Sequence, residues 1–448
     1  MTLNSFNWTL SQIAKHVEGE LVGADLSVNG VSTDSRSEAN GKLFIALKGP
    51  TYDGHDYVHH AEQSYAAAAL VENTVTTSLP QIIVEDTRVA LGKLASAWRN
   101  KFTIPVIGIT GSNGKTTVKE ITTSILSCQH RVLATQGNLN NDIGMPLTLL
   151  QIDKNHDVAV IEMGANHPKE IEYLTKISCP TIAIITNAGP AHLEGFGDLD
   201  GVAKSKGEIF EQLVENGTAI LNADDEYYHY WKKLCGSKKI LSFGLSSEAD
   251  VSARHESDHV LISTPAGNIA VSFKMLGEHN LMNALAATAA CCAANASLAA
   301  IKQGLEQMQG ITGRLQLKIG RNGSRIIDDT YNANPASLGV ALEVLNEFSG
   351  QHLLALGDMG ELGTATEQLH IEAGEQARLL GVHKLYTIGE YARLVAKSFG
   401  TDSKVFIDKP SMISELESCM SDDVTLLVKG SRLMQMEVIV DALAENGE

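Results

Sequence analysis

Ile104-Pro-Val-Ile-Gly-Ile-Thr-Gly-Ser-Asn-Gly-Lys-Thr-Thr117 is the stretch of sequence that decides the fold around it. Residues 104–109 have the composition of a buried β-strand. After Thr117, the apolar residues Val118, Ile121 and Ile125 recur at the three- and four-residue spacing of a helix. A strand that passes through a glycine-rich turn into a helix is the context that a P-loop requires. Because such a loop directs backbone N–H groups and a helix N-terminus at an anion, the stretch predicts a phosphate-binding site.

The loop also contains two side chains whose chemistry suits a nucleotide. Lys115 would reach the β- and γ-phosphates, and the hydroxyl of Thr116 would bind Mg²⁺. Position 109 is Ile, so the loop has the short form T-G-x-x-G-K-T and lacks the additional first glycine of the longer form. The alternative is an ordinary Gly/Asn turn between a strand and a helix. We expect the phosphates to be held by Gly111, Ser112, Asn113, Gly114, Lys115, Thr116 and Thr117.

Apolar strands continue on the C-terminal side of the loop. They are Asp157–Glu162, Thr181–Thr186 and Thr218–Leu221, and helical segments separate them. Apolar strands that alternate with helices indicate a parallel sheet covered on both faces. Residues 238–275 contain shorter, alternating strands that we expect to pair in the antiparallel direction.

The two ends of the chain have α/β patterns of their own. The first ~100 residues mix short β-like runs with helical stretches, as in a small α/β domain. After Gly313, strands at 325–328, 353–356, 384–388 and 424–428 alternate with helical segments, which predicts a doubly wound domain. No G-x-G-x-x-G follows a strand there, so a dinucleotide site is not expected. The predicted fold is α/β, with three domains at residues 1–101, 102–312 and 313–448.

Composition narrows the class of protein further. The chain has 448 residues, and its 35 basic and 53 acidic residues give a net charge of −18. A field of that sign repels nucleic acid and anionic lipid, so neither is an expected partner. The six cysteines form no C-x-x-C pair, and the run Ala284 to Ala294 is about half of the ~20 residues that a membrane span needs. Because the N-terminus lacks a secretory signal pattern, we expect a cytoplasmic protein with no membrane insertion.

Other polar side chains lie where they could join the loop. Glu162 ends one strand and His192 follows the next. Since the carboxyl ends of parallel strands meet at one edge of a sheet, both could approach Thr116. On residue type alone, however, Glu162 could cap a helix or pair with a lysine, and His192 could form an ordinary loop hydrogen bond. Lys204 and Lys206 could equally be solvated lysines on a helix.

A family resemblance becomes specific when several short motifs are taken in their order along the chain. They are Thr110-Gly-Ser-Asn-Gly-Lys-Thr116, Glu162-Met-Gly-Ala-Asn166, Ala191-His-Leu-Glu194, Gly277-Glu-His-Asn-Leu-Met-Asn283, Gly313-Arg314 and Asp328-Asp-Thr-Tyr-Asn-Ala-Asn-Pro335. Together they resemble the ATP-dependent Mur ligases of peptidoglycan synthesis over essentially the whole chain. Asp329-Thr-Tyr-Asn-Ala-Asn-Pro335 and Leu356-Gly-Asp-Met-Gly-Glu-Leu-Gly363 resemble the members that add D-alanyl-D-alanine.

The resemblance implies a fold and a reaction. It implies a UDP-binding domain, an ATP-binding domain and a C-terminal Rossmann-like domain that binds the incoming dipeptide. The implied reaction joins UDP-N-acetylmuramoyl-tripeptide to D-Ala-D-Ala through an acyl phosphate, with ATP converted to ADP and phosphate. It further implies Mg²⁺ as a cofactor and a monomeric enzyme.

The resemblance also implies roles for individual residues. Catalysis would rest on Lys115, Glu162, His192 and Lys206. The metal ligands would be Thr116, Glu162, His192 and a carbamylated Lys206, with Lys204 as the alternative if the register shifts by two. ATP would also contact Asn280, Asn283, Arg314, Asp329 and Tyr331. The UDP-substrate would contact Thr33, Ser35, Arg36, Thr51, Tyr52, Asn138 and Asn141, and D-Ala-D-Ala would contact Asn332, Asn334 and Asp358.

Structural roles compete with several of these assignments. Asn280 and Asn283 could cap a helix or lie on its polar face, and Arg314 could form a hinge salt bridge with Asp329. The short N-terminal motifs could be plain turns. Gly357-Asp-Met-Gly-Glu-Leu-Gly363 could be a strand-to-helix loop with no ligand.

Other functions remain as alternatives. One is a sister ligase that adds L-Ala, D-Glu, a diamino acid, or glutamate to folate. The D-N-P-R type motif of the diamino-acid enzyme is absent, and a folate ligase would not be expected to have the N-terminal domain that contains Asp34-Ser-Arg36. Another is a P-loop regulator or motor, which would need no small-molecule acceptor. A nucleic-acid-directed ATPase is disfavoured by the net charge of −18.

Overall fold

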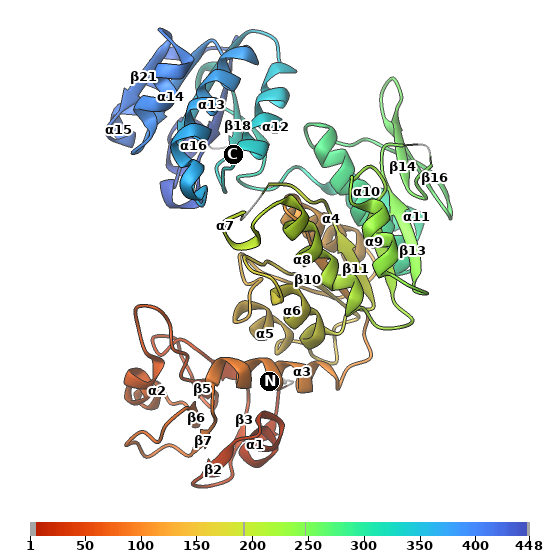
Figure 1. The fold of residues 1–448 in the computed structure, drawn as a ribbon, viewed down its shortest axis with the longest axis vertical. Coiled ribbons are helices and arrows are strands. Elements are labelled where there is room, and N and C mark those ends of the chain that lie inside the picture. The colour runs from red at the N-terminus through yellow and green to blue at the C-terminus, as the bar shows by residue number, and fades with distance from the viewer. Residues whose placement is uncertain (1–5, 191–192, 247, 446–448) are drawn as a thin grey trace.

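The computed structural model describes residues 6–190, 193–246 and 248–445 of the chain. The chain forms three successive parts along one long axis (Figure 1). The N-terminal part lies at one end, the part that contains the P-loop lies in the middle, and the C-terminal part lies at the other end. Within the described ranges, no helix is both long enough and apolar enough to cross a membrane.

The central part is built on a six-stranded parallel sheet, as the sequence predicted. Its strand order is β13-β12-β11-β8-β10-β9. The strands are β8 (Val106–Thr110), β9 (Val132–Ala134), β10 (Val158–Glu162), β11 (Ile182–Ile185), β12 (Thr218–Asn222) and β13 (Lys239–Phe243). Four of these strands, β8, β10, β11 and β12, consist mostly of buried apolar residues, since helices cover both faces of the sheet. The helices are α4 (Lys115–Ser127), α5 (Gly144–Leu149), α6 (Glu170–Ser178), α7 (Leu193–Phe196), α8 (Leu199–Glu211), α9 (Tyr228–Leu234), α10 (Glu278–Ala293) and α11 (Leu298–Gln307).

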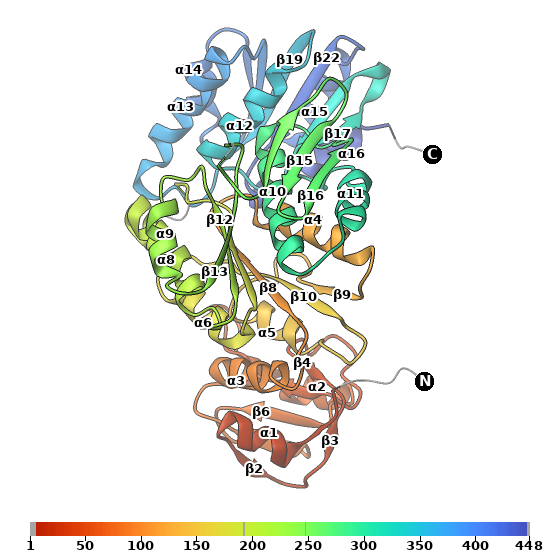
Figure 2. The same ribbon diagram turned by 90° about the vertical axis from the view of Figure 1, so that its right-hand side faces the viewer.

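One expectation about residues 238–275 is only partly correct. β13 pairs parallel with β12, because α9 forms a crossover that returns the chain to the sheet in the same direction. Only β14 (Ser252–His255), β15 (Val260–Thr264) and β16 (Gly267–Val271) form the expected antiparallel sheet. Figure 2 shows this small sheet beside α10 and α11.

The N-terminal part contains a five-stranded sheet of order β2-β7-β6-β5-β4. Its strands are β2 (Glu20–Val22), β4 (Val31–Ser32), β5 (Leu43–Ile45), β6 (Ala68–Val71) and β7 (Gln81–Ile83), and a short pair joins β1 (Trp8–Thr9) to β3 (Ser27–Val28). Its helices are α1 (Leu10–Val17), α2 (Val58–Gln63) and α3 (Thr87–Arg99).

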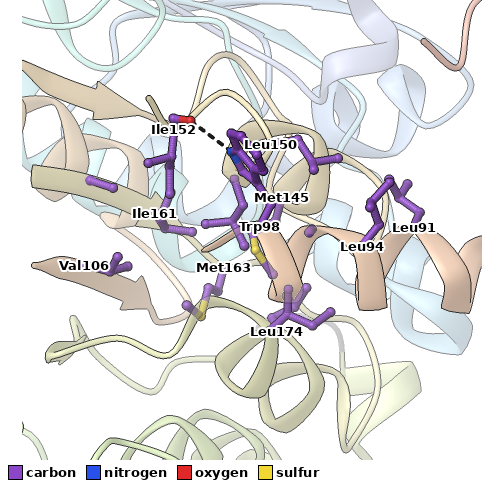
Figure 3. Close-up of a cluster of buried hydrophobic side chains, with 14 of the residues drawn as sticks. Leu91, Leu94, Trp98, Val106, Met145, Leu150, Ile152, Ile161, Met163 and Leu174 are labelled. Atoms are coloured by element: carbon purple, nitrogen blue, oxygen red, sulfur yellow. Dashed lines mark hydrogen bonds between the residues drawn. The ribbon is translucent and has the colours of Figure 1, made fainter. Parts of the chain in front are cut away.

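The apolar face of α3 belongs to the same hydrophobic core as the central sheet. Leu91, Leu94 and Trp98 pack with Met145 and Leu174 of the central helices (Figure 3). The indole of Trp98 also donates a hydrogen bond of 2.9 Å to the carbonyl of Ile152. One continuous core therefore joins the N-terminal and central parts.

The C-terminal part has a six-stranded sheet of order β17-β18-β22-β19-β20-β21. The strands are β17 (Gln316–Ile319), β18 (Arg325–Asp329), β19 (Gln351–Gly357), β20 (Lys384–Ile388), β21 (Ser403–Phe406) and β22 (Val424–Lys429), and only the edge strand β17 is antiparallel. The helices are α12 (Pro335–Asn346), α13 (Thr366–Leu379), α14 (Ala392–Phe399), α15 (Lys409–Cys419) and α16 (Glu437–Leu443). The predicted three-part α/β fold is thus confirmed, while the boundaries at 101/102 and 312/313 stay predictions.

Candidate active site

The P-loop lies between β8 and α4, and its backbone requires glycine at two positions. Gly111 and Gly114 have φ angles of 147° and 80°, in the region that favours glycine. A Cβ at Gly111 would collide with the hydroxyl of Thr186, and one at Gly114 would collide with the side-chain oxygen of Asn283. The loop is therefore closely packed against two neighbouring segments of the central part.

Lys115 folds back over its own loop. Its Nζ donates hydrogen bonds of 2.7 Å to the carbonyl of Gly111 and 3.0 Å to that of Ser112. Burial lowers the pKa of Lys115 from its ordinary value. Beside it, Nη2 of Arg314 donates a 3.0 Å hydrogen bond to Oγ1 of Thr116, so the C-terminal part reaches the loop directly.

A second loop, residues 186–189, is bonded to the P-loop by several reciprocal hydrogen bonds. The side chain of Asn187 bonds to both backbone groups of Asn113: its Oδ1 accepts a hydrogen bond from the N–H at 3.0 Å, and its Nδ2 donates one to the carbonyl at 3.1 Å. Ser112 and Gly189 likewise exchange two bonds of 2.9 Å. These contacts fix the P-loop against the carboxyl end of β11.

Glu162 is a buried carboxylate with one oxygen available. Its side chain is 2% exposed, and Oε1 accepts a 2.8 Å hydrogen bond from Nδ2 of Asn140. Oε2 is buried and has no hydrogen-bond partner among the residues that the structure describes. A buried anionic oxygen without a partner is costly, and a carboxylate next to a hydroxyl is a donor set that Mg²⁺ favours. Glu162 and Thr116 therefore fit a divalent cation. Within the described part of the chain, Glu162 neither caps a helix nor forms an ion pair with a lysine.

Burial distinguishes the two candidate lysines of α8. Lys204 is exposed, whereas Lys206 is only 2% exposed and its Nζ lies 5.1 Å from the ring centroid of Phe196. Burial, with a smaller contribution from the nearby charge of Lys115, lowers the pKa of Lys206 to about 7. The amine is thus about half neutral near pH 7. His192 lies outside the described residues.

Two adjoining cavities lie between the central and C-terminal parts. A polar cavity of about 200 Å³ is lined by Ser112, Asn113, Gly114, Lys115, Thr116, Asn140, Glu162, Gly313, Arg314, Asp329, Tyr331, Asn332, Asn334, Ser337 and Lys429. We call it the phosphate cavity. A second cavity of about 260 Å³, the base cavity, shares Asn113, Gly114, Arg314, Asp329 and Ser337 with the first. The two together have the size and polarity that suit a nucleotide.

The base cavity contains the two predicted asparagines and one residue that sequence reasoning missed. Asn280 and Asn283 line it from the first turns of α10. Neither caps the helix: Gly277 is the cap residue, and Nδ2 of Asn280 donates instead to the carbonyl of Leu276 at 2.8 Å. His279 also lines the cavity, and burial lowers its pKa to about 4, so its ring is neutral at neutral pH.

Arg314 and Asp329 both line these cavities, but each has a different partner. The guanidinium of Arg314 stacks over the Tyr331 ring at 4.2 Å from its centroid. Asp329 forms a buried ion pair with Lys429 at the end of β22. The hinge salt bridge considered from the sequence is therefore not the arrangement found among the described residues.

A separate cavity of about 780 Å³ lies in the N-terminal part. Thr33, Ser35, Arg36 and Tyr52 line it, as predicted for one binding site, whereas Thr51 is not among its lining residues. Arg36 forms a 2.9 Å ion pair with Asp34, and its hydrogen bonds lower the pKa of Asp34 to about 2.

Two asparagines predicted for the UDP-substrate lie outside that cavity. Asn138 and Asn141 are exposed in the loop after β9. Oδ1 of Asn141 accepts hydrogen bonds from the N–H groups of Ile143 and Gly144 at the start of α5. A contact between these asparagines and the UDP-substrate stays a prediction.

A fourth cavity, of about 430 Å³, lies between the loops of the central and C-terminal parts. We call it the C-terminal cavity. Asn332 and Asn334 line it together with Pro190, Gly197 and the turn at 360–365. Asp358, predicted for the same site, is not among the lining residues, because its carboxylate accepts hydrogen bonds from the N–H groups of Glu390 and Tyr391 at 2.6 and 3.2 Å.

His370 is a further residue that sequence reasoning missed near this cavity. It is 1% exposed, and both of its ring nitrogens bond to the backbone. Nε2 accepts from the N–H of Met359 at 3.0 Å, and Nδ1 lies 2.7 Å from the carbonyl of Thr366. His370 therefore fixes the start of the turn that forms one wall of the C-terminal cavity.

The fold and these cavities define a P-loop enzyme whose nucleotide site is completed by a second α/β unit. Comparison with known proteins gives the family. Residues 27–99 match the Mur ligase family catalytic domain, residues 109–291 the Mur ligase middle domain, and residues 313–432 the Mur ligase glutamate ligase domain. The chain belongs to the Mur ligase family.

Similar full-length proteins point in the same direction. The UDP-N-acetylmuramoyl-tripeptide–D-alanyl-D-alanine ligase of Escherichia coli is 42% identical and covers 98% of this chain and 99% of its own length. The crystal structure of MurF from Acinetobacter baumannii superposes with a TM-score of 0.90 at 36% identity, over 97% of this chain and 98% of that one. MurF ligase from Thermotoga maritima in complex with ADP has a TM-score of 0.81 at 27% identity, over 92% and 96%.

Proposed function

We propose that this chain joins D-alanyl-D-alanine to UDP-N-acetylmuramoyl-tripeptide and converts ATP to ADP and phosphate. One observation carries the proposal: the buried Glu162 oxygen without a described partner shares a cavity with Lys115 and Thr116. A ligase that activates a carboxylate needs a site of this kind, where a cation and a triphosphate can meet. The names of the full-length relatives support D-Ala-D-Ala as the acceptor.

In the proposed reaction two anions must approach each other. The terminal carboxylate of the tripeptide attacks the γ-phosphate, the acyl phosphate forms, and ADP leaves. The amine of the dipeptide then attacks the acyl carbon, and phosphate leaves from the tetrahedral intermediate. The enzyme contributes chiefly by positioning the reactants and offsetting their charge.

The residues of the phosphate cavity supply these contributions. Lys115 would exchange its two loop carbonyls for the β- and γ-phosphates, and Arg314 would leave Thr116 for a phosphate oxygen. Thr116 and Glu162 would hold Mg²⁺. When bound, the metal supplies positive charge between phosphate and carboxylate. The neutral ring of His279, with Asn280 and Asn283, would recognise the base and ribose.

Lys206 is suited to carbamylation, because its burial keeps a large fraction of the amine neutral. The neutral amine adds CO₂ and loses one proton to water, so that the lysine side chain carries an anionic carbamate. We propose that this carbamate and His192 are ligands of a second Mg²⁺.

The other two cavities would hold the remaining substrates. The N-terminal cavity, of about 780 Å³, is large enough for a nucleotide, and Thr33, Ser35 and Arg36 offer hydrogen-bond donors to uracil or diphosphate. The C-terminal cavity, of about 430 Å³, would hold D-Ala-D-Ala beside Asn332 and Asn334. We expect the enzyme to work as a monomer in the cytoplasm.

The function can be tested by the substrate requirement for ATP turnover. ADP and inorganic phosphate are expected only when UDP-N-acetylmuramoyl-tripeptide, D-Ala-D-Ala and Mg²⁺ are all present, because the acyl phosphate needs an acceptor to complete the cycle. Product release is measured with each component omitted in turn, and with L-Ala, D-Glu or a diamino acid in place of the dipeptide. Turnover stimulated by DNA, or release of pyrophosphate, would contradict the proposal.

The acceptor site can be tested through His370. His370→Leu leaves the buried N–H of Met359 without a partner, which costs about 1–3 kcal/mol, so we expect the KM for D-Ala-D-Ala to rise by about tenfold. The KM for ATP should stay nearly unchanged. His352→Leu is a matched control. His352 is also a buried histidine bonded to a backbone carbonyl, but it lies at the start of β19, whereas the turn at 360–365 follows the end of that strand. Equal changes in the KM values for D-Ala-D-Ala and for ATP would contradict the assignment of the C-terminal cavity as the D-Ala-D-Ala site.

A further inference from the structure

Lys429 is a buried lysine that the proposed reaction has not yet used. It is the last residue of β22 and its side chain is 1% exposed. Its Nζ forms an ion pair with Oδ2 of Asp329 and donates a 3.0 Å hydrogen bond to the backbone carbonyl of Asn332. A buried ammonium is retained only where such partners offset its loss of water, so both contacts are structurally constrained.

The sheet brings the two charged residues together. β18 and β22 are parallel neighbours, and Asp329 lies directly opposite Lys429 at their carboxyl ends. After Asp329 the chain leaves the sheet, and Asn332 lies in the connection that leads to α12. One ammonium therefore joins the end of a strand to the loop that follows it.

These two partners of Lys429 belong to different cavities. Asp329 lines the base cavity and the phosphate cavity. Asn332 lines the phosphate cavity and the C-terminal cavity, and Lys429 itself lines the phosphate cavity. Lys429 thus bonds both to Asp329, a carboxylate that faces the nucleotide cavities, and to Asn332, in the segment that forms a wall of the C-terminal cavity.

We propose that Lys429 is a positioning residue that couples nucleotide binding to acceptor binding. This inference rests on the proposed function, because it takes the C-terminal cavity as the acceptor site. When a nucleotide engages Asp329, the carboxylate is fixed, and the ammonium bonded to it holds the carbonyl of Asn332 in one place. The wall of the C-terminal cavity is then ordered before the dipeptide arrives, so the dipeptide loses less conformational freedom on binding.

Coupling of this kind is reciprocal, which makes it measurable in either direction. If ADP favours dipeptide binding, saturating dipeptide must strengthen ADP binding by the same factor. We expect D-Ala-D-Ala to lower the Kd for ADP by about fivefold or more in the unaltered enzyme, the lower end of usual coupling between sites. Calorimetric titration of ADP and Mg²⁺ with and without D-Ala-D-Ala measures this factor.

Lys429→Met keeps much of the side-chain volume and removes both bonds. The factor is expected to fall to about one, since the nucleotide and the loop no longer share a partner. Lys429→Gln, which is neutral and shorter, should lose the coupling as well, and it keeps the test available if the methionine variant does not fold.

Lys318→Met is a control for loss of an ion pair with a buried aspartate, since Asp328 is 1% exposed whereas Lys318 is 25% exposed. Lys318 pairs at 2.8 Å with Asp328, the residue directly before Asp329 in the same sheet. Lys318 lines none of the cavities described here. It should lower thermal stability and leave the coupling factor unchanged.

The outcomes separate this inference from the proposed function. Coupling in the unaltered enzyme that is lost on Lys429→Met and kept on Lys318→Met supports the role of Lys429. Unchanged coupling in Lys429→Met, or no coupling in an enzyme that makes the pentapeptide product, overturns it. An unaltered enzyme that makes no such product overturns the proposed function instead.

Discussion

Replacing Lys115 with alanine is expected to lower ATP turnover by about 10³-fold or more, the scale of effect when a charge-stabilising group is removed from phosphoryl transfer. The reason is local. Three basic residues, Lys115, Arg314 and Lys429, line the phosphate cavity, and of these only Lys115 belongs to the P-loop, in a chain with a net charge of −18. Without Lys115, the triphosphate and the tripeptide carboxylate would meet with much less positive charge between them.

The same substitution should leave binding of the UDP-substrate intact. The N-terminal cavity is lined by residues 33–64 and belongs to a different sheet, so the two sites should be energetically independent to within about twofold in Kd. Turnover is measured by ADP release, and binding of the UDP-substrate by calorimetry. If Lys115→Ala also abolished that binding, the assignment of the N-terminal cavity would be wrong.

Lys206→Ala is the second substitution with a large expected effect, a loss of activity of about 100-fold, on the scale seen when a supporting group of a metal site is removed. Lys204→Ala is the matched control: it is two residues away on the same helix, but exposed, and should retain activity. A small carboxylate such as acetate should partly restore Lys206→Ala, because it can occupy the place of the carbamate. Equal activity of the two variants would exclude a role for Lys206.

The dependence on CO₂ and pH tests carbamylation itself. With a pKa of about 7, the neutral fraction of the Lys206 amine rises as the pH passes upward through 7, whereas an ordinary lysine would still be almost fully protonated. At constant dissolved CO₂, activation should therefore increase between about pH 6 and about pH 8 and then level off, one unit on either side of that pKa. Activity that is insensitive to removal of CO₂ at every pH would contradict carbamylation.

The sequence was most informative where local patterns determine local structure. Residues 104–117 predicted the strand, the turn and the helix around the P-loop, because the apolar spacing and the two glycines constrain the backbone there. The strand Lys239–Phe243 shows the limit of that reasoning. Its composition does not distinguish parallel from antiparallel pairing, which depends on the crossover through α9.

Side-chain partners were harder to predict, since they join segments far apart in the chain. Glu162 could be proposed from its place at a strand end, but its partner Asn140 lies 22 residues earlier and was not singled out, although the neighbouring Asn138 and Asn141 were predicted to contact the UDP-substrate. Lys429 directly follows the predicted strand at 424–428, a signal similar to the one that identified Glu162, and could have been found by it. Lys204 and Lys206 differ only in which side of a helix they occupy, so the packing of α8 was needed to separate them.

The core shared by α3 and the central helices has a consequence for how the chain unfolds. Because Leu91, Leu94 and Trp98 are buried against the central part, the N-terminal and central parts lose the same apolar contacts when either one opens. The C-terminal sheet has two hydrophobic clusters of its own. We therefore expect the N-terminal and central parts to unfold as one cooperative unit and the C-terminal part as another, although each of the three parts binds, on our proposal, a different substrate. A fragment that ends after α11 would keep its main core complete, whereas one that begins after α3 would expose it.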